Sequence, residues 1–259
     1  MRHTLVFISA LAAAKRCSLA DVLQSDGSYK LDGCEELQLF GESIGDSGAI
    51  SLAKALATNV EGLLLVDLWH NNIGAPGARA LGAALVTNSR LQRLYLNENP
   101  LGAEGVRALA EGLAGAKSPH HLWLSRTDAG DEGVIALGEA LKSNHVLEAL
   151  DMWECGITGR GARALATALR TNNVLRTLEL RGNPMGDAGA EAFAALMPVS
   201  VPLGVLDLLN TGVTSAGRAV LRTGLAKARA NPYLVVFEDD IGPHQQRTSW
   251  EEKGLADAP

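Results

Sequence analysis

A period of 28 residues runs through most of this chain, and this repeat constrains the fold more than any other feature of the sequence. The repeated string has the form L-x-x-L-x-L followed by a polar turn. Six copies lie in one phase and begin at Leu63, Leu91, Pro119, Leu147, Leu175 and Leu203. Another copy begins at Cys34, 29 residues before Leu63, and an apolar segment near Pro232 predicts the strand of a partial eighth unit. We therefore expect about seven stacked units, each contacting only its neighbours.

The second half of each unit has the spacing of an amphipathic helix. A glycine is followed at intervals of four residues by two large apolar residues, as in Gly77, Leu81 and Leu85. A spacing of four places these side chains on one helical face. In the first half, apolar residues two apart, such as Val66 and Leu68, face the same side of a strand. Each unit is therefore predicted to be a strand, a turn and a helix.

A polar position follows the last apolar residue of each strand by three residues. It holds asparagine in three units, at Asn71, Asn99 and Asn183. A buried asparagine there can bond free backbone groups where the chain turns. The other units have different residues at this position, namely Glu42, Thr127, Cys155 and Thr211. We predict that the rungs at Glu42 and the two threonines are looser.

This pattern resembles a known kind of repeat. L-x-x-L-x-L-x-x-[NC]-x-[IL]-G followed by G-x-x-x-L-x-x-x-L is similar to the leucine-rich repeats of ribonuclease inhibitor, of nucleotide-binding innate receptors and of the Ran GTPase-activating protein. The resemblance covers roughly Cys34 to Phe237. It implies an α/β fold, a right-handed leucine-rich-repeat solenoid. Strands about 4.8 Å apart and helices about 10 Å wide force a horseshoe arc, with parallel strands on the concave side and helices on the convex side.

The repeat divides the chain into three parts. They are an N-terminal cap or possible signal segment (1–33), a leucine-rich-repeat domain (34–241) and a polar tail (242–259) that is predicted to be disordered. The basic start and the apolar stretch from Leu5 to Ala14 have the form of a secretory signal. The alternative is a cap with a strand at Leu5–Ile8 and a helix from Ser9 to about Leu23. The cap interpretation, which we favour because no cysteine-rich end cap is visible, goes with a cytoplasmic location, and the signal interpretation goes with secretion.

The composition excludes several classes of protein. With 47% hydrophobic and 20% charged residues the chain is globular, and with a net charge of −6 it lacks the basic face of a nucleic-acid binder. The apolar stretch near the N-terminus is too short for a membrane span. The three cysteines, Cys17, Cys34 and Cys155, are too few and too scattered for a disulfide framework, and without a C-x-x-C pair they argue against structural zinc. We expect no metal and no cofactor.

The strand positions that face away from the core are the candidate binding surface. Neighbouring strands bring these positions into columns on one contiguous face. Aromatic residues fall in the columns at Phe40, Trp69, Tyr95, Trp123 and Trp153. Acids fall there at Asp67, Glu98, Asp151, Glu154, Glu179 and Asp207, with Arg126 and Arg181 as opposing charges and Asn97 and Ser125 between them. Exposed aromatic residues are enriched in binding hot spots, and an acidic face suits a basic or mixed basic and apolar partner.

The sequence therefore favours a non-catalytic module that binds a partner protein on its concave face. The alternative from the resemblance is a regulator of a small GTPase, although no arginine stands out as the one such an activity needs. An enzyme is disfavoured. His120 and His121 are adjacent in a strand and point to opposite faces, Cys155 falls at a buried turn, and no glycine-rich phosphate loop is present.

Overall fold

The computed structural model describes residues 14–58, 62–199, 202–227 and 235–237. Within these residues nine parallel strands form one sheet whose order follows the chain. The strands are β1 (Arg16–Cys17), β2 (Glu36–Gln38), β3 (Leu65–Asp67), β4 (Arg93–Tyr95), β5 (His121–Trp123), β6 (Ala149–Asp151), β7 (Thr177–Glu179), β8 (Val205–Asp207) and β9 (Val235–Phe237). The helices are α2 (Leu19–Val22), α3 (Gly45–Thr58), α4 (Ala75–Thr87), α5 (Gly102–Leu113), α6 (Gly130–Leu141), α7 (Gly159–Leu169), α8 (Gly186–Ala194) and α9 (Ser215–Lys227).

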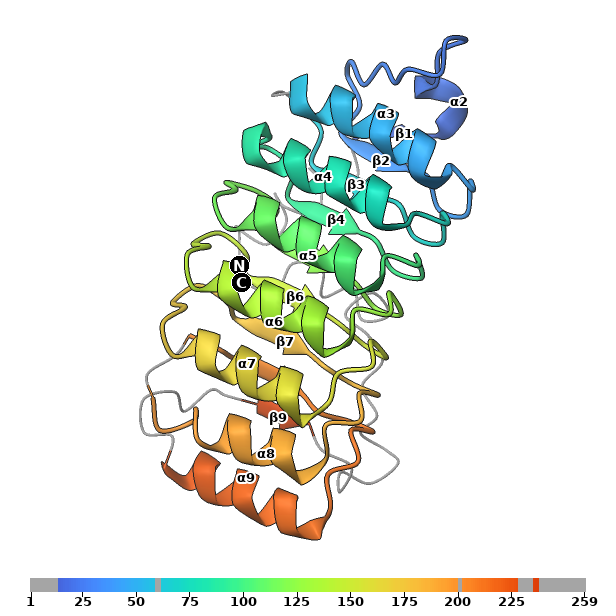
Figure 1. The fold of residues 1–259 in the computed structure, drawn as a ribbon. Helices are drawn as coiled ribbons and strands as arrows, with labels where there is room; N and C mark the ends of the chain where they lie inside the picture. The colour runs from blue at the N-terminus through green and yellow to red at the C-terminus, as the bar shows by residue number, and fades with distance from the viewer. Residues whose placement is uncertain (1–13, 59–61, 200–201, 228–234, 238–259) are drawn as a thin grey trace.

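The strands and helices form two layers, as predicted for the solenoid. Figure 1 shows helices α3 to α9 stacked as one layer in front of the sheet. Because the units have nearly the same length, equivalent residues pair, as Val66 does with Leu94 and Leu94 with Leu122. The inward side chains of this column are all buried, at Leu37, Val66, Leu94, Leu122, Leu150, Leu178 and Leu206. Helix leucines such as Leu81 and Leu109 meet them in one continuous core.

Small residues let neighbouring helices approach closely. A side chain at Gly82 would place its Cβ 2.6 Å from the carbonyl oxygen of Ala108, on the next helix. A Cβ at Gly112 would collide with the backbone of Gly82. Glycine at these two positions therefore sets how tightly α4 packs on α5.

The predicted asparagine position is buried and bridges neighbouring rungs. The Asn183 amide donates to the carbonyl oxygens of Met152 and Leu180, both at 2.7 Å. Its oxygen accepts the backbone N–H groups of Cys155 at 2.9 Å and Ile157 at 3.0 Å, one rung back. Asn99 repeats this arrangement toward the preceding rung. The prediction of a buried, fully bonded asparagine is confirmed at these rungs.

The threonine rungs make fewer bonds between rungs. Thr211 is fully buried, but its hydroxyl donates only to Leu208 of its own rung, at 2.7 Å. The backbone N–H of Met185, which has no asparagine to meet, bonds the Asn183 carbonyl oxygen at 2.7 Å instead. The Thr127 hydroxyl likewise donates to Leu124 of its own rung. Glu42, at the same position of the first unit, is exposed. Both units that precede a threonine rung have a proline in the turn, Pro100 or Pro184, across which this short backbone bond forms.

A second asparagine position was missed in the sequence. Asn88, Asn144 and Asn172 lie buried where a helix returns to the next strand. The Asn172 oxygen accepts the backbone N–H groups of Val174 and Leu175, and its amide donates to the Leu141 carbonyl oxygen of the preceding unit. The sequence carries the signal, since each of these asparagines lies three residues before a strand leucine.

Three helices are capped by an aspartate from the helix before them. The Asp131 carboxylate accepts the N–H groups of Thr158 and Gly161, at the start of α7. Asp46 does the same for α4, and Asp187 meets Thr214 before α9. Each aspartate stands in a G-D-x-G string that starts its own helix. A carboxylate at a helix N-terminus satisfies free N–H groups and complements the helix dipole.

One prediction for the N-terminal segment is wrong. The helix expected from Ser9 to about Leu23 is interrupted, because Arg16 and Cys17 form β1 and α2 spans only Leu19–Val22. The sequence argued only against a disulfide framework, and it did not predict the single disulfide between Cys17 and Cys34, whose Cα atoms are 5.9 Å apart. The pairing of β1 with β2 brings together two cysteines that are distant in sequence.

Some sequence predictions fall outside the described residues. These are the strand at Leu5–Ile8, the signal interpretation of residues 1–14 and the disordered tail 242–259. Strand β9 lies in the segment predicted as the partial eighth unit and extends the sheet beside β8. No helix in the described ranges combines the length and apolar character needed to cross a membrane.

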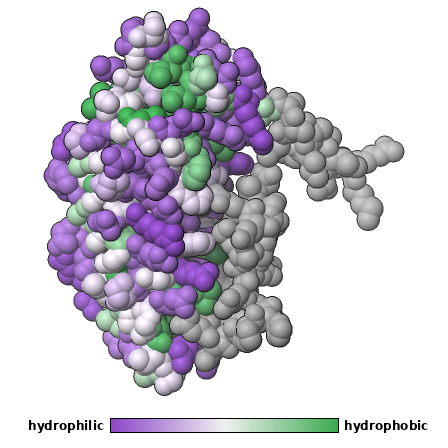
Figure 2. All heavy atoms as spheres, turned by 90° about the vertical axis from the view of Figure 1, so that its right-hand side faces the viewer, coloured by the Kyte–Doolittle hydropathy of each residue, from purple (hydrophilic) through white to green (hydrophobic). Residues whose placement is uncertain are grey.

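Figure 2 shows the array from one edge. Hydrophilic residues cover most of the described surface in this view, and hydrophobic residues gather near the N-terminal end. The large hydrophobic side chains that remain exposed include Phe40 on the concave side and Val86 on α4.

Candidate protein-binding face

The concave face consists of outward residues brought into register by the parallel strands. The column predicted from Gln38 to Asp207 is paired at every step, with Asp67 beside Tyr95, Tyr95 beside Trp123 and Trp123 beside Asp151. The sheet therefore unites the predicted residues on one surface.

The sequence reasoning missed a further column on this face. Residues two positions earlier point the same way because strand side chains alternate. They are Glu36, Leu65, Arg93, His121, Ala149, Thr177 and Val205. Of the two adjacent histidines predicted to point to opposite faces, His121 lies on the concave side, with its ring centroid 5.6 Å from that of Trp123.

The aromatic residues form contacting pairs. The rings of Phe40 and Trp69 meet edge to face with centroids 5.4 Å apart, and those of Tyr95 and Trp123 stack at 4.2 Å. Phe40 is 59% exposed and the other three rings are half-buried. Within each pair the rings partly cover one another, and all four stay partly exposed on the concave side.

Trp153 lies further along the same face. The Arg181 guanidinium carbon is 5.8 Å from the centroid of the Trp153 ring, which is a cation–π distance. The indole N–H groups of Trp69 and Trp153 are buried, and neither has a hydrogen-bond acceptor within the part of the chain that the structure describes. Both donors therefore lie beneath the surface of the concave face.

Three aspartates of the face bond the backbone just after their strands. The carboxylates of Asp67, Asp151 and Asp207 accept the N–H groups of the residues two positions on, at 3.0, 3.2 and 2.9 Å. Burial raises the pKa of Asp67, and the N–H of Trp69 partly opposes that rise. These carboxylates shape the strand ends as well as giving the face its charge.

Exposure was predicted wrongly for part of the face. Asp151 and Glu179 are only 8% and 7% exposed, and Asn97 and Ser125 are similarly buried. The Ser125 hydroxyl donates to Asp151. Strands spaced at about 4.8 Å crowd their outward side chains, so shorter residues lie beneath longer neighbours.

A ladder of charged side chains borders the aromatic residues. Arg126 lies between two carboxylates, with Nη1 2.9 Å from Glu98 and Nε 2.8 Å from Glu154. His70 Nδ1 lies 3.5 Å from the other oxygen of Glu98. These contacts raise the pKa of Arg126, led by its hydrogen bonds to Glu154 and Glu98. Each contact joins neighbouring rungs, and Arg126 thus has its charge balanced within the chain.

Histidine, cysteine and acidic side chains are the groups among the described residues that bear on metal and thiol chemistry. Across the described ranges, no group of three or more histidine, cysteine or acidic side chains is placed to hold a metal ion. Cys155 is buried, and burial raises the pKa of its thiol to about 11. Its sulfur donates to the Leu124 carbonyl oxygen at 3.0 Å, which is the bond that an asparagine makes elsewhere. This thiol has a structural position.

Comparison with known proteins agrees with the repeat. A family model described as "Leucine Rich repeat" matches residues 63–82, 87–110, 143–166 and 171–194. No curated protein matches the sequence. Among solved structures, leiomodin-1 actin-binding site 2 is similar, with 20% identity over 59% of this chain and 88% of that chain and a TM-score of 0.48. The chain carries leucine-rich repeats, which generally mediate protein–protein interaction.

Proposed function

We propose that this chain is a non-catalytic module that binds a partner protein on its concave face. The observation that carries the proposal is two pairs of aromatic rings, Phe40 with Trp69 just after β2 and β3, and Tyr95 with Trp123 on β4 and β5. Large, rigid rings on an accessible sheet supply binding energy at a small cost in conformational entropy.

The charge of the face supports a partner with a basic or mixed basic and apolar surface. Of the six acids in the predicted columns, Asp151 and Glu179 are buried and Glu98 and Glu154 pair with Arg126. The other two, Asp67 and Asp207, are half-buried, and Arg181 lies over a tryptophan ring. A lysine or arginine from a partner would find both carboxylates and ring faces here.

The experiment is quantitative affinity capture from a native lysate with three versions of the chain. They are the unchanged chain, the Trp69→Ala and Trp153→Ala double variant, and Val86→Ala. Val86 is 54% exposed on α4 and controls for loss of an exposed hydrophobic side chain on the convex side. We expect a protein retained by the unchanged chain and by Val86→Ala, and lost from the double variant. Equal retention by all three would remove the site from the concave face.

Two finer points complete the proposal. The repeats are of the ribonuclease-inhibitor-like subclass, because each unit alternates a strand with a helix of 9 to 14 residues from α3 to α9. The GTPase-regulator alternative has less support, because both arginines of the predicted columns are engaged within the chain. Acceleration of GTP hydrolysis by the chain would reverse that preference.

The cap disulfide also bears on location. Of the two locations predicted from the sequence, cytoplasm and secretion, an intramolecular disulfide favours the second, because cytosolic thiol pools keep most cysteines reduced. Mass spectrometry of the chain isolated from its own cells, with thiols alkylated at lysis, tests this. A reduced Cys17 and Cys34 pair would return the location to the cytoplasm.

A further inference from the structure

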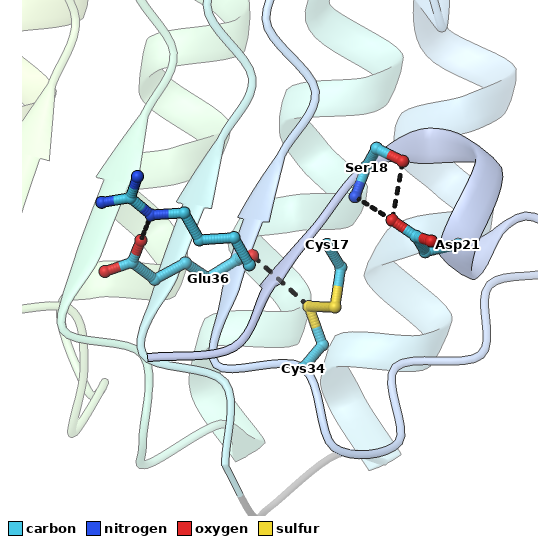
Figure 3. The surroundings of a disulfide bond; sticks show 6 residues. Cys17, Ser18, Asp21, Cys34 and Glu36 are labelled. Carbon is cyan, nitrogen blue, oxygen red and sulfur yellow. Dashed lines mark hydrogen bonds and ion pairs between the residues drawn. A yellow bond between two sulfur atoms is a disulfide. The ribbon is translucent and has the colours of Figure 1, made fainter. Parts of the chain in front are cut away.

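The N-terminal cap is attached to the array at few points. β1 has two residues, and the Lys15 carbonyl oxygen accepts the N–H groups of Glu35 at 2.9 Å and Glu36 at 3.1 Å. Arg16 Nε lies 2.9 Å from a Glu36 carboxylate oxygen, with the arginine side chain 65% exposed. The disulfide from Cys17 to Cys34 is the only covalent cross-link among the described residues, and Figure 3 shows it beside this ion pair.

The described part of the cap, residues 14–33, contains only short secondary-structure elements. Helix α2 has four residues, whereas α3 to α8 have 9 to 14 and pack on neighbouring helices. Ser18 and Asp21 close the start of α2 by bonding each other, which stabilises the helix but not its attachment. The main apolar anchors are Val22, Tyr29 and Leu31. An exposed ion pair adds little, so the disulfide and these three buried side chains hold the cap in place.

The two sulfur atoms are protected from reagents. Cys17 is 6% exposed and Cys34 is 1% exposed. The Cys34 sulfur lies 3.4 Å from the Glu36 carbonyl oxygen, within the β1–β2 junction. A thiolate must reach a sulfur to reduce the bond, so reduction requires the cap to open first. The bond therefore resists reduction while the cap is closed, and it can be reduced only after the cap has opened.

We propose that the Cys17–Cys34 disulfide is a redox-controlled clamp that closes the N-terminal end of the solenoid. When it forms, the two thiols lose two protons and two electrons to a thiol–disulfide oxidant, such as glutathione disulfide or an oxidoreductase. A mixed disulfide forms first, and the second cysteine then displaces the leaving thiol, so the oxidant ends as two thiols. When a dithiol reductant reverses these steps, the β1–β2 pairing and the buried apolar side chains hold the cap without a covalent link, and the cap opens more often. Each opening exposes the backbone groups of β2 as a sheet edge, which can pair with another chain.

The test follows backbone amide exchange in the full chain. The reporters are the N–H groups of Glu35 and Glu36, which donate to Lys15 of the cap. The variants are Cys17→Ser and the matched control Cys155→Ser, which removes the buried free thiol far from the cap. A cross-link spanning 17 residues constrains the unfolded cap, so we expect exchange at the reporters on the order of 100-fold faster in Cys17→Ser. The control should leave these amides unchanged.

A second arm uses the unaltered protein in case Cys17→Ser does not fold. The chain is refolded with glutathione disulfide, mapped by peptide mass spectrometry, and then reduced with a phosphine while exchange is followed. A Cys17–Cys34 peptide lacking two hydrogen atoms, with fast reporter exchange after reduction, supports the clamp. Free thiols at both positions, pairing of either with Cys155, or unchanged exchange after reduction would each overturn it.

Discussion

The replacement Asn183→Ala tests whether the buried asparagine position holds neighbouring rungs together. The Asn183 side chain is fully buried and bonds backbone groups in two consecutive units. Alanine would leave the N–H groups of Cys155 and Ile157 without an acceptor in the core. Each orphaned buried donor costs roughly 1–3 kcal/mol, for a range of roughly 2–6 kcal/mol. We expect a loss of about 3 kcal/mol in the free energy of unfolding, because the alanine methyl group also relieves the burial of a polar amide.

The variant Asn183→Thr refines this magnitude. A threonine there would keep the bond to Leu180 of its own rung, as Thr211 bonds Leu208, and would still leave both donors unpaired. We expect its loss to be about 1 kcal/mol smaller than that of Asn183→Ala.

Urea unfolding followed by circular dichroism measures both variants, with Asn173→Ala as the control. Asn173 is exposed and adjacent to the buried Asn172, so its replacement should stay within about 0.5 kcal/mol of the unchanged chain. If Asn183→Ala unfolds at the same urea concentration as Asn173→Ala, the bonds between rungs contribute nothing net and the reasoning is refuted.

Three further results are expected. Asp131→Asn should destabilise by about 1 kcal/mol at pH 7, because it removes a negative charge at the N-terminus of α7. Burial raises the pKa of Asp131 but hydrogen bonding lowers it further, so this contribution is present above pH ~4 and is lost as the pH falls through the lower folded pKa. The urea curves of the two proteins should converge below that pKa. Gly112→Ala should lower the free energy of unfolding, measured by thermal unfolding, by about 1–3 kcal/mol, because its methyl group meets the Gly82 backbone. Gly115→Ala, which has open space around it, should leave the free energy of unfolding unchanged. Equal effects of the two variants would contradict the close approach of the helices. Cys155, with its pKa raised to about 11 by burial, should resist iodoacetamide at pH 8 in the folded chain and react after denaturation, and rapid alkylation of the folded chain would show that the rung opens.

The repeat made the fold predictable because each unit fixes the next. A period of 28 residues places Val66 beside Leu94 without any knowledge of distant contacts, and the structure pairs them. The face was predictable for the same reason, since outward positions follow from strand alternation. Burial of the side chains on that face was not predictable. The exposure of Asp151 depends on the size and rotamers of the neighbouring side chains on β5 and β7, and the aligned sequence positions do not give those rotamers.

Other features were written in the sequence but are not part of the leucine pattern. The aspartate of G-D-x-G caps the following helix, and the asparagine before each strand leucine holds the helix-to-strand return. The disulfide had no such signal. Residues 14–33 lie outside the period, so nothing in the sequence set the distance between Cys17 and Cys34, and only the pairing of β1 with β2 did.

The neighbour-only packing has a mechanical consequence. Eight strand pairings connect nine strands in series, and beyond β1 and β2 each helix touches mainly the helices beside it. Small rotations at such interfaces add up along the array. A rotation of about 1° at each of the eight strand pairings gives about 8° between the two ends, while every contact stays close to its optimal geometry. The aromatic rings of β2 to β5 would then move as a group relative to the acids of β6 to β8. The array could thus adjust its curvature to a partner at little energetic cost, and its stiffness becomes a property that can be measured by pulling on the two ends.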